Sequence, residues 1–196
     1  MAVTVRQGSP QQVVVEGAPD DLAQLQTTVA DGRLTVDTKS GADWKAFLGS
    51  HPSLGKVTVR ITMPTINALS VSSSGSLKAA TVRADNLALG VSSSGHVGIG
   101  QLQAAELHPA LSSSGSIRVG GGTCPRQEVA ISGSGSVEAA GLQSEAGEAR
   151  ISSSGNCRLR ASQTLDAHLS GPGGVYVLGN PKITSRTSGS ARVRPG

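Results

Sequence analysis

Serine residues at fixed intervals are the first feature of this sequence that could do chemistry. Runs of Ser and Gly recur with a step of twenty, each directly after an aliphatic residue: Val71, Val91, Leu111, Ile131 and Ile151. A serine nucleophile needs a base within reach and a strained turn. No His or Asp recurs at a matching offset, and His96 stands once where other copies carry Ser or Asn. We therefore interpret the hydroxyls as hydrogen-bonding groups at a tight corner and not as catalytic groups.

Acidic and histidine side chains recur at another position of the repeat, seventeen residues after the leading aliphatic residue. This column holds His108, Glu128 and Glu148, with Asp166 in a shortened copy. If successive copies stack, neighbouring carboxylates would lie about 5 Å apart, a spacing compatible with surface binding, cation binding or glycosidase chemistry. The alternative is a solvated, charge-balanced face, because Arg150 and His168 are close enough in sequence to neutralise the acids.

Metal ligands are poorly represented in the repeats. Known calcium-binding β-rolls use a nine-residue repeat with an Asp in each copy, whereas here Ser, His, Asn or Gly follows the repeated glycine. No carboxylate cage follows either. We expect no metal ion and no other cofactor.

Two cysteines invite a disulfide. Cys124 and Cys157 would lie two coils apart, roughly 9 to 10 Å along the stack, which exceeds the reach of a disulfide. The sequence therefore predicts free thiols, which say little about the redox compartment.

The elements that must position these groups are the repeats themselves, since a period of twenty indicates a solenoid. Six positions after each leading aliphatic residue lies an apolar column: Leu77, Val97, Ile117, Val137, Cys157 and Val175. A second apolar strand precedes each serine run, and Val82, Leu102 and Leu142 supply a third column that Gly122 interrupts. These patterns predict an all-β parallel β-helix of about six to seven coils, right-handed by analogy with parallel crossovers. The repeated glycine indicates a turn that needs a positive φ or that leaves no room for a side chain.

Residues 1–70 differ from the repeats and predict an irregular, β-rich capping region, continuous with the repeat region 71–196 in one domain. Alternating valines indicate half-buried strands, Asp31-Gly32 predicts a hairpin turn, and Pro19 begins a short expected helix. Trp44, Phe47 and Leu48 would share one face of a helical turn. This turn would cover an open end of the solenoid or, alternatively, contact a ligand or partner.

Composition excludes several classes of protein. Only one Trp, one Tyr and one Phe accompany 26 Gly, so the interior must consist of small aliphatic side chains. The net charge of +4 includes a cationic tail (Lys182, Arg186, Arg192, Arg194), but the aromatic platforms of nucleic-acid binders are missing. The sequence contains no apolar run of about 18 residues, so we expect no membrane-spanning segment. We also see no leader and no lipid-attachment cysteine near Met1.

A resemblance to a known family emerges from several segments. Residues 57–64 (VTVRITMP), 175–181 (VYVLGNP) and 188–193 (SGSARV), together with the repeats, resemble the head GIN domain of putative autotransporter adhesins. The resemblance covers nearly the whole chain. It implies a bacterial protein of the cell envelope or extracellular space with a β-helical head and no established enzymatic activity. Many members carry Asp after the repeated glycine, so a cation role tied to that Asp does not carry over.

Three functional hypotheses follow. The first is a non-enzymatic adhesin-like or scaffold module that binds a surface ligand, either glycan or protein. The alternatives are a carbohydrate-active β-helix enzyme, which would need convergent carboxylates in a groove, and an envelope structural or signalling accessory protein. Contact between copies through the ends or edges of the solenoid is also compatible with the sequence.

Overall fold

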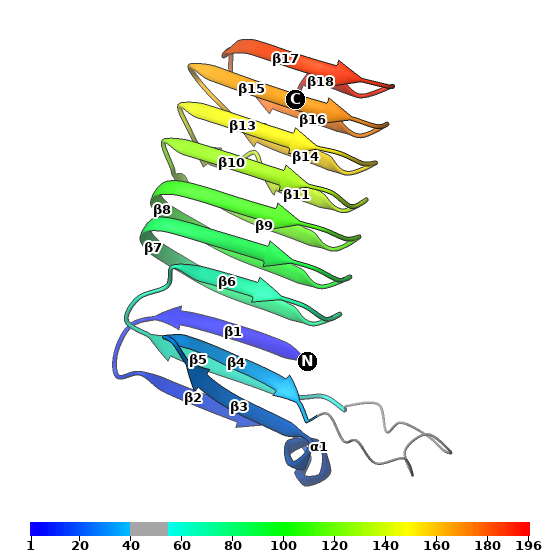
Figure 1. The fold of residues 1–196 in the computed structure, drawn as a ribbon. Coiled ribbons are helices and arrows are strands. Elements are labelled where there is room, and N and C mark those ends of the chain that lie inside the picture. Colours follow the sequence, from blue (N-terminus) through cyan, green and yellow to red (C-terminus); the bar gives the residue numbers. More distant parts are fainter. Residues whose placement is uncertain (40–54) are drawn as a thin grey trace, which may run out of the picture.

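Stacked β-strand coils form most of the molecule. The computed structural model describes residues 1–39 and 55–196, and it is a β-solenoid of about six turns (Figure 1). Each full coil runs out along one face, bends, returns along the other face and closes in a Ser-Gly turn. We call the strands that leave the turn the exit face and the strands that lead into it the return face.

The repeat strands are β6 (Ala68–Val71), β7 (Ser76–Val91), β8 (His96–Leu111), β9 (Ser116–Thr123), β10 (Arg126–Ile131), β11 (Ser136–Ala139), β12 (Leu142–Gln143), β13 (Ala146–Ile151), β14 (Asn156–Arg160), β15 (Thr164–Ser170), β16 (Gly174–Leu178), β17 (Lys182–Ser188) and β18 (Arg192–Pro195). Strands β7 and β8 span both faces. In the later coils a break separates the faces, so that β9, β11, β14, β16 and β18 lie on the exit face. Strands β10, β13, β15 and β17 lie on the return face.

Residues at the same position of successive repeats lie beside one another and form columns along the solenoid. Parallel pairing places Leu77 beside Val97, Val97 beside Ile117, and so on through Val137, Cys157 and Val175. Every member of this column is at most 7% exposed. The third predicted column is also present, because Leu102 pairs with both Val82 and Gly122, and Gly122 pairs with Leu142. The sequence prediction of stacked parallel coils is therefore confirmed.

The last two coils are shorter than the others. Ala146 pairs with Thr164 and Thr164 with Lys182, a step of eighteen in place of twenty. The two missing residues are lost between the faces and not within the strands. The outward and inward positions therefore stay in phase along the whole stack.

The N-terminal region joins the same stack. Strand β1 (Ala2–Gln7) lies between β7 and β5 (Thr58–Met63) and is parallel to both, and β2 (Gln12–Glu16) pairs antiparallel with β5. The short helix α1 (Pro19–Ala23) precedes a separate hairpin of β3 (Leu25–Ala30) and β4 (Arg33–Thr38). Asp31 and Gly32 form its two-residue turn with φ of 50° and 73°, which confirms the predicted hairpin.

The repeated glycine is required by close packing of successive turns. None of the six repeated glycines has a positive φ: Gly75, Gly95, Gly115, Gly135, Gly155 and Gly173. A Cβ at Gly115 would lie 2.6 Å from Val91 Cγ1 and 2.7 Å from the backbone oxygen of Ser93. Of the two explanations that the sequence left open, the lack of room for a side chain is the correct one.

Candidate functional site

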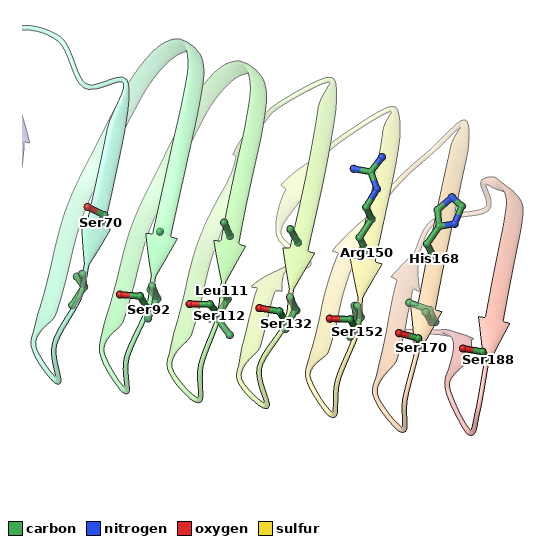
Figure 2. A pocket seen from close by; sticks show the side chains of 18 of the residues that line it. Ser70, Ser92, Leu111, Ser112, Ser132, Arg150, Ser152, His168, Ser170 and Ser188 are labelled. Carbon is green, nitrogen blue, oxygen red and sulfur yellow. The ribbon is translucent and has the colours of Figure 1, made fainter.

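The serine residues that follow the return strands form a row on the outside of the solenoid. Figure 2 shows Ser92, Ser112, Ser132, Ser152, Ser170 and Ser188 side by side on successive coils. The turns are joined chiefly by backbone bonds, for example from Ser112 N to Val91 O at 3.0 Å and from Ser132 N to Leu111 O at 2.9 Å. Within the described residues, a serine hydroxyl bonds the carbonyl of the neighbouring turn at one place, from Ser113 to Ser93. The first serine of each run is exposed, with its hydroxyl directed away from the core.

A long open groove lies beside this serine row. It has a volume of about 980 Å³ and crosses the coils from β6 to β17 on the outside of the return face. Its floor is the outward column two residues before the serines: Ser70, Gly90, Ala110, Ala130, Arg150, His168 and Arg186. Because the first four of these side chains are small, the surface is hollow there. Arg150 and His168 lie toward the C-terminal end of the groove (Figure 2).

The predicted carboxylate column runs beside the floor of this groove, outside the residues that line it, and we call it the rim. Register places Glu128 beside Glu148 and Glu148 beside Asp166, each two residues before a member of the floor. His108 Nδ1 lies 3.4 Å from Glu128 Oε2. The four residues of the predicted column thus lie together on one outward face.

Arg150 links the carboxylates into a charge-balanced network. One guanidinium nitrogen lies 2.6 Å from Glu128 Oε1, and the other pairs with the carboxylate of Glu148. The hydrogen bond from Arg150 lowers the pKa of Glu128, since it stabilises the ionised form. His168 Nε2 lies 3.3 Å from Asp166 Oδ1. A general acid for glycoside cleavage needs a raised pKa, so Glu128 is poorly suited to that role.

A Ser–His contact occurs on the exit face. His96 Nδ1 lies 2.8 Å from Ser116 Oγ, and both residues are on the outside of neighbouring coils. The position of His96 in the sequence does not predict this pairing. In the described part of the chain no carboxylate pairs with His96, so the third member of a hydrolytic triad is missing there.

The two cysteines are free, as predicted, and buried. Burial raises the pKa of the Cys124 thiol to about 11 and that of Cys157 to about 12. Thiols of this kind are structural and not reactive at neutral pH. They contribute to the core and not to the surface site.

One predicted contact cannot be placed. Trp44, Phe47 and Leu48 lie outside the described residues, so their expected role as a cap or partner contact stays a prediction.

Among residues 1–39 and 55–196, no group of three or more His, Cys, Asp or Glu side chains could hold a metal ion. No helix in those ranges is long and apolar enough to cross a membrane.

Sequence reasoning missed the groove because small residues carry no motif. The signal that could have found it is the column of Ser70, Gly90, Ala110 and Ala130, one residue before each leading aliphatic position. With a period of two, this column must share the outward side with the first serine of each run. A row of four small side chains on one outward face indicates a hollow surface.

Comparisons with known proteins identify a matching family and structures that share the solenoid fold. A family model described as "Putative auto-transporter adhesin, head GIN domain" matches residues 1–181. No protein of curated function matches the chain.

Three solved structures share the fold. A putative adhesin from Bacteroides fragilis has a TM-score of 0.85 and 23% sequence identity, covering 99% of this chain and 87% of that chain. A putative lipid binding protein from Parabacteroides distasonis has a TM-score of 0.76 and 24% identity, covering 99% and 88%. A putative adhesin from the same organism has a TM-score of 0.73 and 21% identity, covering 100% and 89%. At these identities the likeness concerns the fold alone.

Proposed function

Because the chain belongs to the family of putative auto-transporter adhesins with a head GIN domain, we propose that it is a non-enzymatic surface module of the bacterial cell envelope that binds an extended glycan. The ligand lies in the groove of the return face, along the axis of the solenoid. The single observation that carries this proposal is the continuous groove with its serine row, which repeats on successive coils.

The chemistry of the groove suits a sugar chain. Its floor of small residues and the edges of aliphatic side chains offer an apolar surface for the faces of sugar rings, and the serine hydroxyls can both donate and accept hydrogen bonds. Arg150 and His168 lie on the floor, and Glu128 and Glu148 lie on the rim, where they would bond to sugar hydroxyls. We assign His108 and Asp166 to the same rim.

The spacing of the groove suits a polymer. Parallel strands repeat about every 4.8 Å, which is comparable to the length of one sugar unit in an extended glycan. Each coil therefore presents nearly the same hydroxyl to the next sugar, and the coils of β6, β7, β8 and β10 also present a small floor residue. A ligand with a matching repeat gains contacts in proportion to the number of coils that it covers.

The same geometry argues against turnover. Glu128 is held ionised by Arg150, and within the described residues no hydrogen bond joins a serine of the groove to His168, the histidine on its floor. The runner-up is a carbohydrate-active enzyme, and the carboxylate column is the feature that favours it. Release of reducing sugar distinguishes the two functions.

A glycan array tests this proposal. We expect the protein to bind extended glycans on the array without releasing reducing ends. An Ala110→Arg variant, which fills the floor of the groove, should bind at least about ten-fold more weakly. The matched control is Ala80→Arg, which adds the same charge at an exposed position outside the groove and should bind normally. An array without hits, or equal binding by both variants, would contradict the proposal, and sugar release would favour the enzyme.

A further inference from the structure

The two long faces of the solenoid carry opposite net charge. On the exit face, the segments 76–80, 96–100, 116–120, 136–139, 156–160 and 174–178 contain four Lys and Arg and one acidic residue, a formal charge of +3. On the return face, the segments 68–71, 86–91, 106–111, 126–131, 146–151 and 164–170 contain two Arg and four acidic residues, a formal charge of −2. The groove lies on the return face, so the cationic surface is a separate feature.

Three of the four exit-face cations form one line along the solenoid. Register stacks the residues of this outward column in the order Lys78, Gly98, Arg118, Glu138, Arg158 and Tyr176. The cations therefore lie on alternate coils, about 9.6 Å apart along the axis. Lys78, Arg118 and Arg158 are all exposed, and among residues 1–39 and 55–196 none of them belongs to an ion pair.

Arg158 is positioned by a neighbour that leaves its charge intact. Its guanidinium carbon lies 5.6 Å from the centroid of the Tyr176 ring, a distance typical of a cation–π contact. Glu138 is in register with both Arg118 and Arg158, but within the described part of the chain it forms an ion pair with neither. Both arginines are thus available to an external anion.

A row of polar side chains runs beside the cation line, two residues earlier in each strand. Register stacks its members in the order His96, Ser116, Ser136 and Asn156. Hydroxyl, imidazole and amide groups of this kind can donate and accept hydrogen bonds. The exit face therefore offers cations and hydrogen-bonding groups in two adjacent lines along the same axis.

A linear polyanion matches this arrangement better than other anionic partners. The acidic rim of a second copy is already paired with Arg150, and a bilayer would contact cations spread over an area in place of a single line. Proteins bind single-stranded nucleic acids through aromatic stacking platforms, and the tyrosine of this face is occupied by Arg158. A polysaccharide with one acidic group per repeat of two sugars carries its anions at about the distance between alternate coils.

We propose that the exit face binds an acidic polysaccharide that extends along the solenoid axis, with its carboxylate or sulfate groups paired with Lys78, Arg118 and Arg158. The polar row bonds to the sugar hydroxyls between these ion pairs. Ion pairs between exposed groups are screened by salt, so the affinity declines as ionic strength increases. None of the three cations lines the groove, so this second site does not rest on the groove proposal.

Titration with an acidic oligosaccharide tests this inference. The probe is a hyaluronan oligosaccharide, which has one carboxylate per repeat of two sugars and is chosen long enough to cover the coils from Lys78 to Arg158. We expect binding that weakens as salt increases. The variant K78S/R118S/R158S should bind about ten-fold more weakly, because three exposed ion pairs are lost.

The matched control R83S/R126S/K182S removes three exposed cations outside the exit face and should retain most of the binding. A neutral chitin oligosaccharide of the same length is the second control, and its binding should respond neither to salt nor to the variant K78S/R118S/R158S. No binding of hyaluronan, equal losses in the two triple variants, or equally tight binding of an oligothymidylate would overturn the inference.

A gain in affinity gives an independent test. Glu138→Gln removes the acidic residue between Arg118 and Arg158 and should strengthen hyaluronan binding about two-fold to three-fold. Glu106→Gln on the return face is the matched control and should leave the affinity unaltered. An affinity that does not increase in Glu138→Gln would contradict an anion bound along this column.

The exit-face site and the groove can be tested apart. Ala110→Arg, which fills the groove, should bind hyaluronan normally at the exit face. K78S/R118S/R158S should retain the binding of neutral glycans in the groove. Failure of this inference is therefore distinguishable from failure of the groove proposal.

Discussion

The glycine at the end of each serine run is a residue on which close stacking of the turns depends. At Gly115 the space for a Cβ is already occupied by Val91, by the Ser93 carbonyl oxygen and, closest of all, by the carbonyl oxygen of Gly95. Two of these three obstacles are backbone atoms, which cannot move without shifting the neighbouring coil. Close stacking of the turns thus requires that this position carry no side chain.

We predict that Gly115→Ala lowers the free energy of unfolding by about 1 to 3 kcal/mol, because the added methyl group overpacks the turn. The matched control is Gly98→Ala on the exit face, where the nearest atom to a new Cβ is 3.9 Å away. That substitution should be neutral or stabilise by up to about 1 kcal/mol through the unfolded state. Urea unfolding of both variants checks the difference, and equal stability would contradict the packing account.

Arg150 is the residue that sets the ionisation of the groove rim. In an Arg150→Gln variant the pKa of Glu128 should rise toward its ordinary value of 4.5, because the largest stabilising contact of its carboxylate is lost. NMR titration of the Glu128 carboxyl measures this change. Arg118→Gln, which removes a cation from the exit face, should leave the pKa of Glu128 unaltered. An unchanged pKa in Arg150→Gln would show that the ion pair does not form in solution.

The same pair has a predictable effect of pH on stability. Since the folded-state pKa of Glu128 is lowered, its stabilisation is fully present above pH 4.5 and is lost as the pH falls through the folded-state pKa. The side chains of Arg150 and Glu128 are 56% and 32% exposed, so solvent screening should keep the difference in stability between wild type and Arg150→Gln small at neutral pH. Urea unfolding at several pH values measures this difference, which should vanish at strongly acidic pH. A difference that grows as the pH falls would have the wrong sign for this ion pair.

Among the elements, the repeat strands could be predicted from sequence and the N-terminal strands could be predicted only in part. Columns such as Leu77 to Val137 follow from a fixed period, and a fixed period directly encodes which strands stack. Strand β1 has a clear period-two pattern, but nothing in that pattern says that it lies between β5 and β7, which come from distant parts of the chain. Pairing partners at such a separation depend on the whole stack.

Coils should behave as interchangeable units. Deletion of residues 112–131 removes one full period and returns every offset to register, so we predict a folded protein with a lower unfolding midpoint. Deletion of residues 112–121 removes half a period, so the residues after the deletion no longer match the register of the preceding coil. This deletion should abolish cooperative unfolding. Circular dichroism and thermal melts compare the two, and loss of folding after the full-period deletion would contradict independent stacking.

At the scale of the whole molecule, the solenoid offers a long groove on its side. The candidate site could be predicted in part, because Glu128, Glu148 and Asp166 were correctly placed on one face. The groove floor depends on the shape of neighbouring coils, which a residue pattern does not specify.

The most direct test of the account is the dependence of glycan affinity on chain length. Titration calorimetry with oligosaccharides of increasing length, chosen from the series that binds on the array, measures it. If the ligand lies along the groove, affinity should increase with each added sugar until the coils from β6 to β17 are covered, and Ala110→Arg should interrupt that increase. An affinity that is the same for the shortest and longest members would contradict binding along the solenoid axis.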